Sequence, residues 1–173
     1  MVSGSGAESK CECPPEAGSS SCDLRQESEI SRCPTCGQRG KAVDTATLKA
    51  LLSVSLMEIR PVAYYFCRTV ACPAVYFAAA GGQQFTEASL RERVHQKHPD
   101  EDDVFVCYCF RHAPATIKAE LIETGRTDVT EAITAGIQAG KCACEIRNPQ
   151  GSCCLGNVRA VVQRLTAVAG TRE

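Results

Sequence analysis

The first half of the chain is organised around the stretch Phe66-Cys67-Arg68-Thr69-Val70-Ala71-Cys72-Pro73, in which two cysteines enclose four residues. An earlier pair, Cys33 and Cys36, encloses two residues in Cys33-Pro34-Thr35-Cys36-Gly37. A tight turn can aim the two sulfur atoms of such a pair at a common point, and four thiolates in two pairs suit tetrahedral zinc. Because four cysteines leave no open position for water, the spacing predicts a structural zinc site.

The residues around the second pair indicate strands. Segments 62–66 and 74–77 are rich in β-branched and aromatic residues and flank the cysteine turn, as in a zinc ribbon. Two alternatives exist for the four cysteines. A redox dithiol would require the alternating βαβ pattern of thioredoxin-like chains, which is missing. Four unrelated core cysteines are disfavoured by the paired spacing.

The composition supports a metal protein. The chain has 173 residues, 13 cysteines and no tryptophan, which predicts two small modules stabilised by metal rather than by large apolar cores. A secreted disulfide scaffold is disfavoured by the odd cysteine count and by an N-terminus without a basic start or an apolar run. We therefore expect a reduced, cytoplasmic protein.

Charge and hydropathy exclude other classes. No apolar stretch approaches the roughly 18 residues needed to span a bilayer, so the chain is not expected to insert into a membrane. The formal net charge is −1, with acidic and basic residues interspersed. Because a nucleic-acid surface needs a basic stripe, no nucleic-acid partner is expected.

The pattern divides the chain into three parts. Residues 1–31 are rich in Ser, Gly, Glu and Pro and are predicted to be a disordered tail. Residues 32–99 form the predicted zinc-binding lobe. Residues 104–169 form a second, helical lobe, with helices predicted from Pro114 to Gly125, from 128 to 140 and from Leu155 onward. The predicted fold class is α+β: a small zinc-ribbon-like β/α lobe followed by a small helical metal-binding lobe.

The second lobe carries its own cysteine set. Cys107 and Cys109 lie in a predicted strand over 104–110, where residues i and i+2 point the same way, so both can reach one iron. Two further ligands must come from four later cysteines: Cys142, Cys144, Cys153 and Cys154.

The choice among the later cysteines rests on local geometry. Neighbouring side chains such as Cys153 and Cys154 diverge, so one of them is expected to bind. Cys154 directly precedes the last helix, whose free N–H groups favour an anionic thiolate. Cys144 is preferred over Cys142 because it shortens the reach across the following turn. Cys142 and Cys153 remain the alternates.

Two other kinds of metal site are possible alternatives for this lobe. A second zinc is the main rival to an iron–sulfur cluster. A Rieske centre needs two histidines in paired Cys/His motifs, and only Cys109-x2-His112 fits that pattern.

These residues resemble a known family. A Cys-x-Cys, a helical hairpin and cysteines at the start of a last helix resemble the bacterioferritin-associated-ferredoxin type of [2Fe–2S] domain. The fuller pattern is similar to the N-terminal region of CopZ-type copper chaperones over roughly residues 31–166. It comprises Cys107-Tyr108-Cys109-Phe110, Gly140-Lys141-Cys142-Ala143-Cys144-Glu145 and Asn148-Pro149-Gln150-Gly151-Ser152-Cys153-Cys154-Leu155-Gly156, with Tyr65-Phe66-Cys67 and Val75-Tyr76-Phe77 upstream.

The resemblance implies a zinc-binding lobe followed by a [2Fe–2S] lobe. With the ligands expected from the spacing, zinc is predicted at Cys33, Cys36, Cys67 and Cys72, and the cluster at Cys107, Cys109, Cys144 and Cys154, with Cys142 and Cys153 as alternates. Complete chaperones of that kind add a heavy-metal-associated domain with a Met-x-Cys-x-x-Cys loop. Only Met1 and Met57 are present here, and neither precedes such a loop.

The resemblance also implies a metallochaperone. Its cluster would donate the electron that reduces Cu(II), and thiolates would carry Cu(I) to a membrane P-type ATPase or another metal carrier or redox partner. Cys11, Cys13 and Cys22 in the tail are candidate soft-metal ligands, because thiolates favour Cu(I). An unstructured tail with reactive thiols is the alternative interpretation of these three.

The same residues also fit a different class of function: a small [2Fe–2S] electron-transfer or redox- or metal-sensing module that carries no metal cargo. An enzyme is not expected, because the sequence shows no Ser/His/Asp set, phosphate loop or nucleotide fingerprint.

Overall fold

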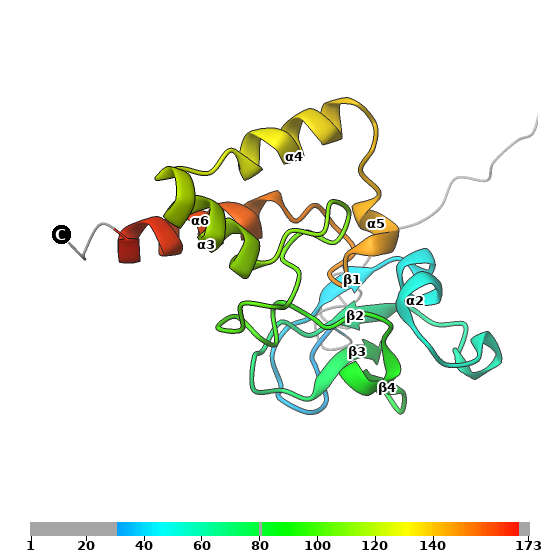
Figure 1. Ribbon diagram of the computed structural model, residues 1–173. Coiled ribbons are helices and arrows are strands. Elements are labelled where there is room, and N and C mark those ends of the chain that lie inside the picture. The colour runs from blue at the N-terminus through cyan, green and yellow to red at the C-terminus, as the bar shows by residue number, and fades with distance from the viewer. Residues whose placement is uncertain (1–30, 80, 170–173) are drawn as a thin grey trace, which may run out of the picture.

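The computed structural model describes residues 31–79 and 81–169. It has two layers, a sheet with its covering helix and a group of helices on the other side of a central junction (Figure 1). The predicted disordered tail, including Cys11, Cys13 and Cys22, lies outside the described residues except for its last residue. The predicted α+β fold class is confirmed.

The sheet is a four-stranded antiparallel meander. Its strands lie in the order β1 (Lys41–Val43), β2 (Tyr64–Phe66), β3 (Ala74–Ala78) and β4 (Gln84–Thr86). The expected strands on either side of the second cysteine pair are thus confirmed as β2 and β3. Every residue of β3 is buried, because the chain covers both faces of this central strand.

One face of the sheet is covered by α2 (Thr45–Leu51), whose N-terminus is capped by the Asp44 carboxylate accepting a 2.7 Å hydrogen bond from Ala46 N. Two 3-10 turns, η1 (Leu56–Glu58) and η2 (Glu87–Ser89), complete this lobe. The core of this lobe consists of buried, mostly large apolar side chains: Leu48, Leu52, Tyr64, Phe66, Val75, Tyr76 and Val94. This core is small, as the composition indicated.

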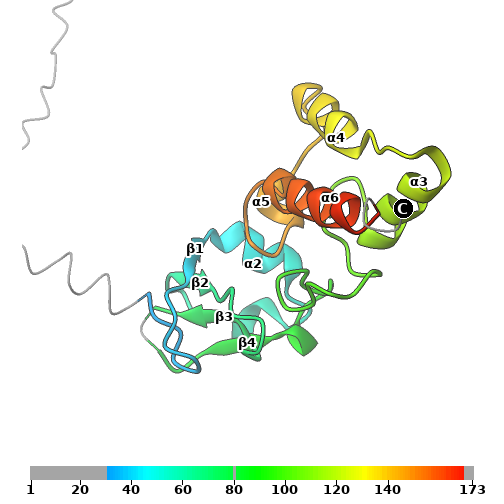
Figure 2. The same ribbon diagram turned by 90° about the vertical axis from the view of Figure 1, so that its left-hand side faces the viewer.

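The helical layer consists of α3 (Pro114–Thr124), α4 (Val129–Gln138), α5 (Cys144–Arg147) and α6 (Leu155–Ala169). Pro114 is the first helical residue of α3, and Gly125 ends it in the left-handed conformation at φ 75°. Helix α6 packs against α3 and α4, while α5 packs against α2 of the sheet layer (Figures 1 and 2). The three long predicted helices are therefore confirmed.

The segment that carries Cys107 and Cys109 differs from the prediction. The prediction of a strand over 104–110 is wrong, because the chain folds back in a turn from Cys107 to His112. Cys107 N and His112 N each donate a 3.1 Å hydrogen bond to the other residue's carbonyl, and Arg111 takes a positive φ of 58°. Val104 and Val106 are buried because the segment passes through the junction between the layers. Burial, rather than strand pairing, therefore accounts for the apolar run.

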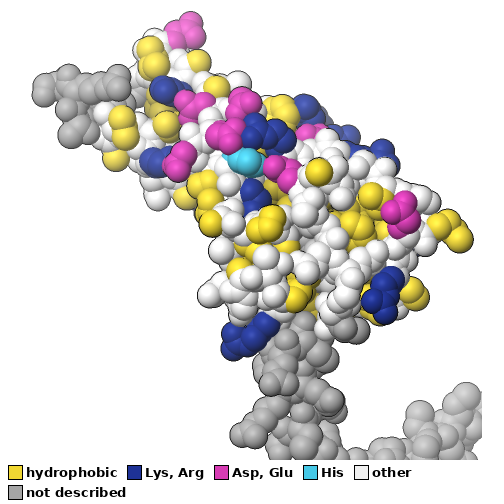
Figure 3. All heavy atoms as spheres, turned by 90° about the horizontal axis from the view of Figure 1, so that it is seen from below, with side chains coloured by type: hydrophobic (Ala, Val, Ile, Leu, Met, Phe, Trp, Pro, Cys, Tyr) yellow, Lys and Arg dark blue, Asp and Glu magenta, His cyan; other side chains and the backbone are white. Residues whose placement is uncertain are grey.

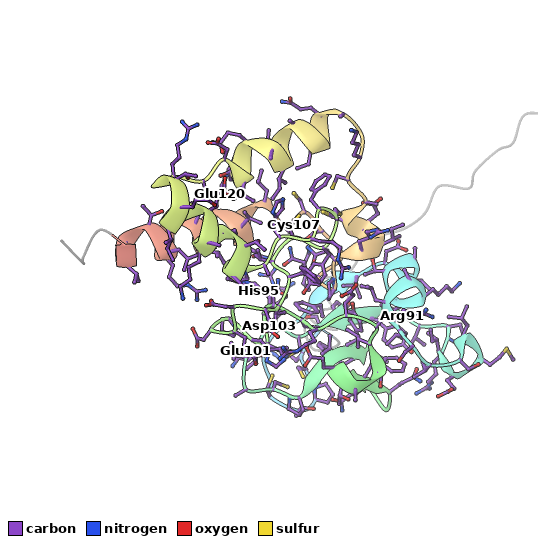
Figure 4. All side chains as sticks on the ribbon, viewed as in Figure 1. Arg91, His95, Glu101, Asp103, Cys107 and Glu120 are labelled. Carbon is purple, nitrogen blue, oxygen red and sulfur yellow. The ribbon has the colours of Figure 1, made fainter. Side chains whose placement is uncertain are left out.

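Hydrogen bonds hold the two layers together. The loop at 148–152 is bound by the sheet lobe, since Tyr76 OH donates to Pro149 O at 2.7 Å and Lys41 Nζ donates to Gln150 O at 3.2 Å. Tyr108 OH, from the turn, donates to Arg93 O at 2.8 Å and accepts from His95 N at 2.9 Å. Figure 4 shows Cys107 and His95 at this junction. The second cysteine set therefore depends on both layers.

The surface is mixed in charge. On the face seen in Figure 3, acidic and basic side chains lie beside each other near the junction, and Arg93 pairs with Glu101 at 2.6 Å and with Asp103 at 3.3 Å. No helix within residues 31–79 and 81–169 is both long and apolar enough to cross a membrane.

Candidate metal centres

The first cysteine pair is shaped by a tight turn. Gly37 N donates to Cys33 O at 2.8 Å, and Cys33 N donates to Gln38 O at 2.8 Å. Gly37 takes φ 71°, a conformation that costs glycine little because it has no Cβ. The turn directs the side chains of Cys33 and Cys36 to one point.

The second pair lies in the connection between β2 and β3. β2 ends at Phe66 and β3 begins at Ala74, so Cys67 and Cys72 stand at the two ends of one strand connection. Cys72 N donates to Thr69 O at 3.1 Å, which tightens that connection. The antiparallel register thus brings the second pair over the first turn.

All four sulfur atoms of this first site lie within 4.8 Å of one another. The Sγ–Sγ distances are 3.8 Å between Cys33 and Cys72 and 3.6 Å between Cys36 and Cys67. A regular tetrahedron with Zn–S bonds of about 2.3 Å has edges of about 3.8 Å. The four thiols therefore have the size of a zinc site without rearrangement.

Neighbouring polar groups adjust the charge at this site. Burial acts to raise the pKa of Cys36, but hydrogen bonds from Thr69 and the backbone of Gln38 outweigh it and lower the pKa to about 6. Burial raises the pKa of Cys72 to about 12. Four close thiols cannot all ionise without a cation, so a divalent metal resolves the repulsion between them.

Lys97 is a residue that the sequence did not single out. Its ammonium donates to Thr69 O at 2.7 Å and to Cys72 O at 2.9 Å, so it binds two carbonyl groups of the cysteine connection. It lies 25 residues beyond Cys72 in the sequence, and no local pattern signals such a contact.

The second site gathers thiols from three segments. Cys109 comes from the turn after Cys107, Cys142 and Cys144 from the start of α5, and Cys154 from the residue before α6. Cys109, Cys142 and Cys144 lie within 4.8 Å of one another. The Sγ–Sγ distances are 3.6 Å for Cys109 to Cys144 and 3.2 Å for Cys142 to Cys144.

Cys107 and Cys154 extend this set inward. A hydrogen bond with the Cys154 thiol is the largest effect that lowers the pKa of Cys107, to about 7. The same thiol has the largest effect on Cys144, lowering its pKa to about 5, while the pKa of Cys154 itself is raised by donating to both. Cys107 and Cys154 therefore lie near the outer three thiols, although neither belongs to their convergent group within the described residues.

Burial separates the predicted ligands from one alternate. Cys107, Cys144 and Cys154 are buried, whereas Cys153 is exposed. The exposure of Cys153 and the burial of Cys154 agree with the expected divergence of these neighbours. Within the described residues, Cys107, Cys153 and Cys154 all lie outside the two groups of convergent thiols. Cys142, the other alternate, lies beside Cys144 and is half-buried.

Backbone amides point at the sulfur atoms of the second site. Ala143 N donates to Cys109 Sγ at 3.4 Å, and the amides of Phe110 and Cys109 act on Cys107 and help to lower its pKa. Such N–H donors stabilise thiolates and bound iron–sulfur clusters. The donor set is all sulfur, contains no carboxylate, and fits a soft metal or an iron–sulfur cluster.

His112 does not join this set. It is half-buried and pairs with Cys107 through the backbone alone. Burial lowers its pKa. A Cys/His ligand pair in the Rieske manner is therefore not formed.

Two all-cysteine groups on a small α+β fold define a metal-binding protein. Residues 30–91 match the CopZ-type zinc-finger family, described as a zinc binding domain. The fold is similar to the X-ray structure of the Archaeoglobus fulgidus CopZ N-terminal domain, with 30% sequence identity and a TM-score of 0.61. The match covers 75% of this chain and 96% of that chain.

The chain therefore belongs to the family of CopZ N-terminal domains. It carries that family's zinc-binding domain, whose four-cysteine set fits Zn²⁺. A comparison with curated protein sequences gives no match.

Proposed function

We propose that this protein is an iron–sulfur metallochaperone that handles copper, with a structural zinc in the sheet lobe and a [2Fe–2S] cluster in the second site. The observation that carries the proposal is the convergence of Cys109, Cys142 and Cys144, with the buried thiols Cys107 and Cys154 near them, in a member of the CopZ family. Metal carriage and electron transfer, rather than enzymatic turnover, are the chemistry that such a site supports.

The zinc is proposed to be structural. Cys33, Cys36, Cys67 and Cys72 fill all four tetrahedral positions and leave none for water or substrate. The cysteine cluster packs with Ala74 and Phe77 of β3, so the metal completes a core that is otherwise too small for the sheet.

The cluster ligands are proposed from burial and from the electrostatic effect of one thiol on another. Cys144 and Cys154 are buried and the Cys154 thiol lowers the pKa of Cys144, while Cys153 is exposed. When bound, a [2Fe–2S] cluster supplies one electron per reduction, which is the electron that Cu(II) needs to become Cu(I). The protein holds the cluster through four thiolates and orients their sulfur atoms with backbone amides.

The first experiment is metal analysis with an absorption spectrum on anaerobically purified full-length protein. The expected result is one zinc and two irons per chain, with the visible bands of a [2Fe–2S] centre. Two zincs and no iron would overturn the cluster assignment and favour the second-zinc alternative.

The second experiment tests the role in copper handling. The anaerobically reduced protein is mixed with a stoichiometric amount of Cu(II), and Cu(I) is read with a colorimetric chelator. Reduction of one Cu(II) per cluster is expected. The visible absorption of the cluster, which is bleached in the reduced protein, should return as the cluster is reoxidised. If the cluster is present but Cu(II) stays unreduced, the copper role fails while the cluster assignment stands.

The proposed partner is a metal-transporting P-type ATPase or another carrier. It is tested by mixing copper-loaded protein with the soluble metal-binding domain of such an ATPase and measuring copper in each after separation. Transfer of copper supports carriage. Retention of all copper on this chain favours the alternative of an electron-transfer or sensing module without cargo.

A further inference from the structure

The second site contains one thiol more than a cluster needs. Cys142 Sγ lies 3.2 Å from Cys144 Sγ and 4.0 Å from Cys109 Sγ, and these two are 3.6 Å apart. The three sulfur atoms form a compact triangle at the outer side of the site, since Cys109 and Cys142 are half-exposed. Cys107 and Cys154 are buried behind them.

The triangle has the dimensions of a three-coordinate metal site. The point in its plane that is equidistant from the three sulfur atoms lies about 2.1 Å from each, close to the metal–sulfur distance of about 2.3 Å that thiolates make. No carboxylate or imidazole belongs to this group. Three thiolates without nitrogen or oxygen ligands select soft ions, of which Cu(I) is the first-row example.

The three thiols overlap only in part with the proposed cluster ligands. Cys109 and Cys144 belong to both sets, Cys142 only to the triangle, and Cys107 and Cys154 only to the cluster set. A thiolate that holds an iron of the cluster cannot at the same time complete a separate trigonal site, so the two occupants exclude each other.

We propose that Cys109, Cys142 and Cys144 form a trigonal Cu(I) site that competes with the cluster for Cys109 and Cys144. In the cluster-free protein, Cu(I) replaces the thiol protons still present and forms three Cu–S bonds. In the cluster-loaded protein, the bonds from iron to Cys109 and Cys144 break, Cys142 loses its proton, and iron and sulfide leave as Cu(I) binds, with no change of oxidation state. Cys142 is thus the residue through which a soft metal ion enters the site. The competition with the cluster rests on the proposed function, whereas the copper site does not.

The first test uses the cluster-loaded full chain. Cu(I), held by a competing chelator, is titrated anaerobically while bound copper, released iron and zinc are counted. We expect the protein to take up one Cu(I) per chain as it loses its two irons. Cys142→Ser should need at least ten-fold more free Cu(I) to lose them. To remove binding by the tail, all proteins carry Cys11→Ser, Cys13→Ser and Cys22→Ser.

A matched control uses the other spare thiol. Cys153→Ser removes an exposed cysteine outside both sets, so its titration should coincide with that of the parent. If Cys142→Ser and Cys153→Ser behave alike, the trigonal site is overturned.

A second variant keeps the two hypotheses separate. Cys154→Ser should lack the cluster but still bind one Cu(I) per chain, and adding Cys142→Ser should abolish that binding. X-ray absorption on the copper-loaded Cys154→Ser protein should show three sulfur neighbours near 2.3 Å. Zinc content equal to that of the parent confirms that the variants are folded.

The outcomes test the trigonal copper site and the proposed cluster ligands separately. Tight Cu(I) binding by the Cys142→Ser, Cys154→Ser protein overturns the trigonal site and leaves the cluster assignment untouched. A cluster in Cys154→Ser, or its loss in Cys142→Ser, overturns the proposed cluster ligands while the copper titration still decides the inference.

Discussion

The two cysteine sites differ in how their ligands are supplied, and the difference separates a closed site from an open one. The zinc set comes from two turns, each with its own pair, and its four thiols satisfy one tetrahedral ion. The second set comes from three segments and contains a fifth thiol, Cys142, beside Cys144. A closed set serves stability, because no ligand can be exchanged without loss. A surplus ligand at a half-exposed edge permits exchange.

The largest effect of a single substitution is expected at the zinc site, where it would test whether the closed site stabilises the fold. Cys67→Ser should release zinc and unfold the sheet lobe, because zinc binding contributes about 10 kcal/mol in small zinc domains, as much as a typical domain's stability. Zinc content and thermal unfolding by circular dichroism measure this. Cys153→Ser, which removes an exposed thiol, is the control and should unfold as the parent does. A Cys67→Ser protein that keeps its zinc and its sheet would contradict the structural role.

The adjacent residues Cys153 and Cys154 provide a matched pair of variants that tests the ligands of the second site. Cys154→Ser should abolish the visible absorption of the cluster, because Cys154 is a proposed ligand whose buried thiol influences both Cys107 and Cys144. Cys153→Ser should leave the absorption and the iron content unchanged. Zinc should stay at the level of the parent in both variants. Equal loss of iron from both proteins would contradict the assignment of Cys154, rather than Cys153, as a cluster ligand.

A glycine in α4 tests how the turn that carries Cys109 is held. A Cβ at Gly136 would collide with the ring of Phe110, the residue after Cys109. Gly136→Ala should therefore destabilise the helical lobe by about 2 kcal/mol and make the cluster more labile to chelators. Gly156→Ala is the control, since a Cβ there meets nothing within 4 Å. Denaturant unfolding and the rate of iron release measure the effect; equal stability of both variants would show that the ring moves freely.

The smallest effect is expected at the hydrogen bond that joins the lobes. Tyr76→Phe removes the 2.7 Å bond to Pro149 O and should cost about 1 kcal/mol, because the carbonyl is left buried without its partner. Tyr65→Phe is the control, as the Tyr65 hydroxyl makes no hydrogen bond to the described residues. Iron should leave the Tyr76→Phe protein faster than the Tyr65→Phe protein while zinc is unaffected. Identical rates would mean that the loop at 148–152 is held by its other contacts.

Local pattern predicted the elements that depend on near neighbours. The strands on either side of the Cys67 connection and the helices that start at Pro114 and end at Gly125 follow from residue types a few positions apart, since turns, caps and strand propensity act over that range. The strand expected at 104–110 failed for a related reason. Its apolar residues are buried by the meeting of two lobes, a long-range event that a local pattern cannot distinguish from a strand.

The sequence by itself determined that the chain binds metal through cysteine, because the spacing of Cys33, Cys36, Cys67 and Cys72 already matches the geometry of one tetrahedral ion. It also supplied the four later cysteines, but left open which of them converge. Only the tertiary structure decided that, by bringing Cys142 and Cys144 to Cys109, burying Cys154 and leaving Cys153 exposed. The physical reason is that a ligand set drawn from three segments is fixed by packing between lobes, as Tyr76 and Tyr108 show, and not by the turn in which any one cysteine lies.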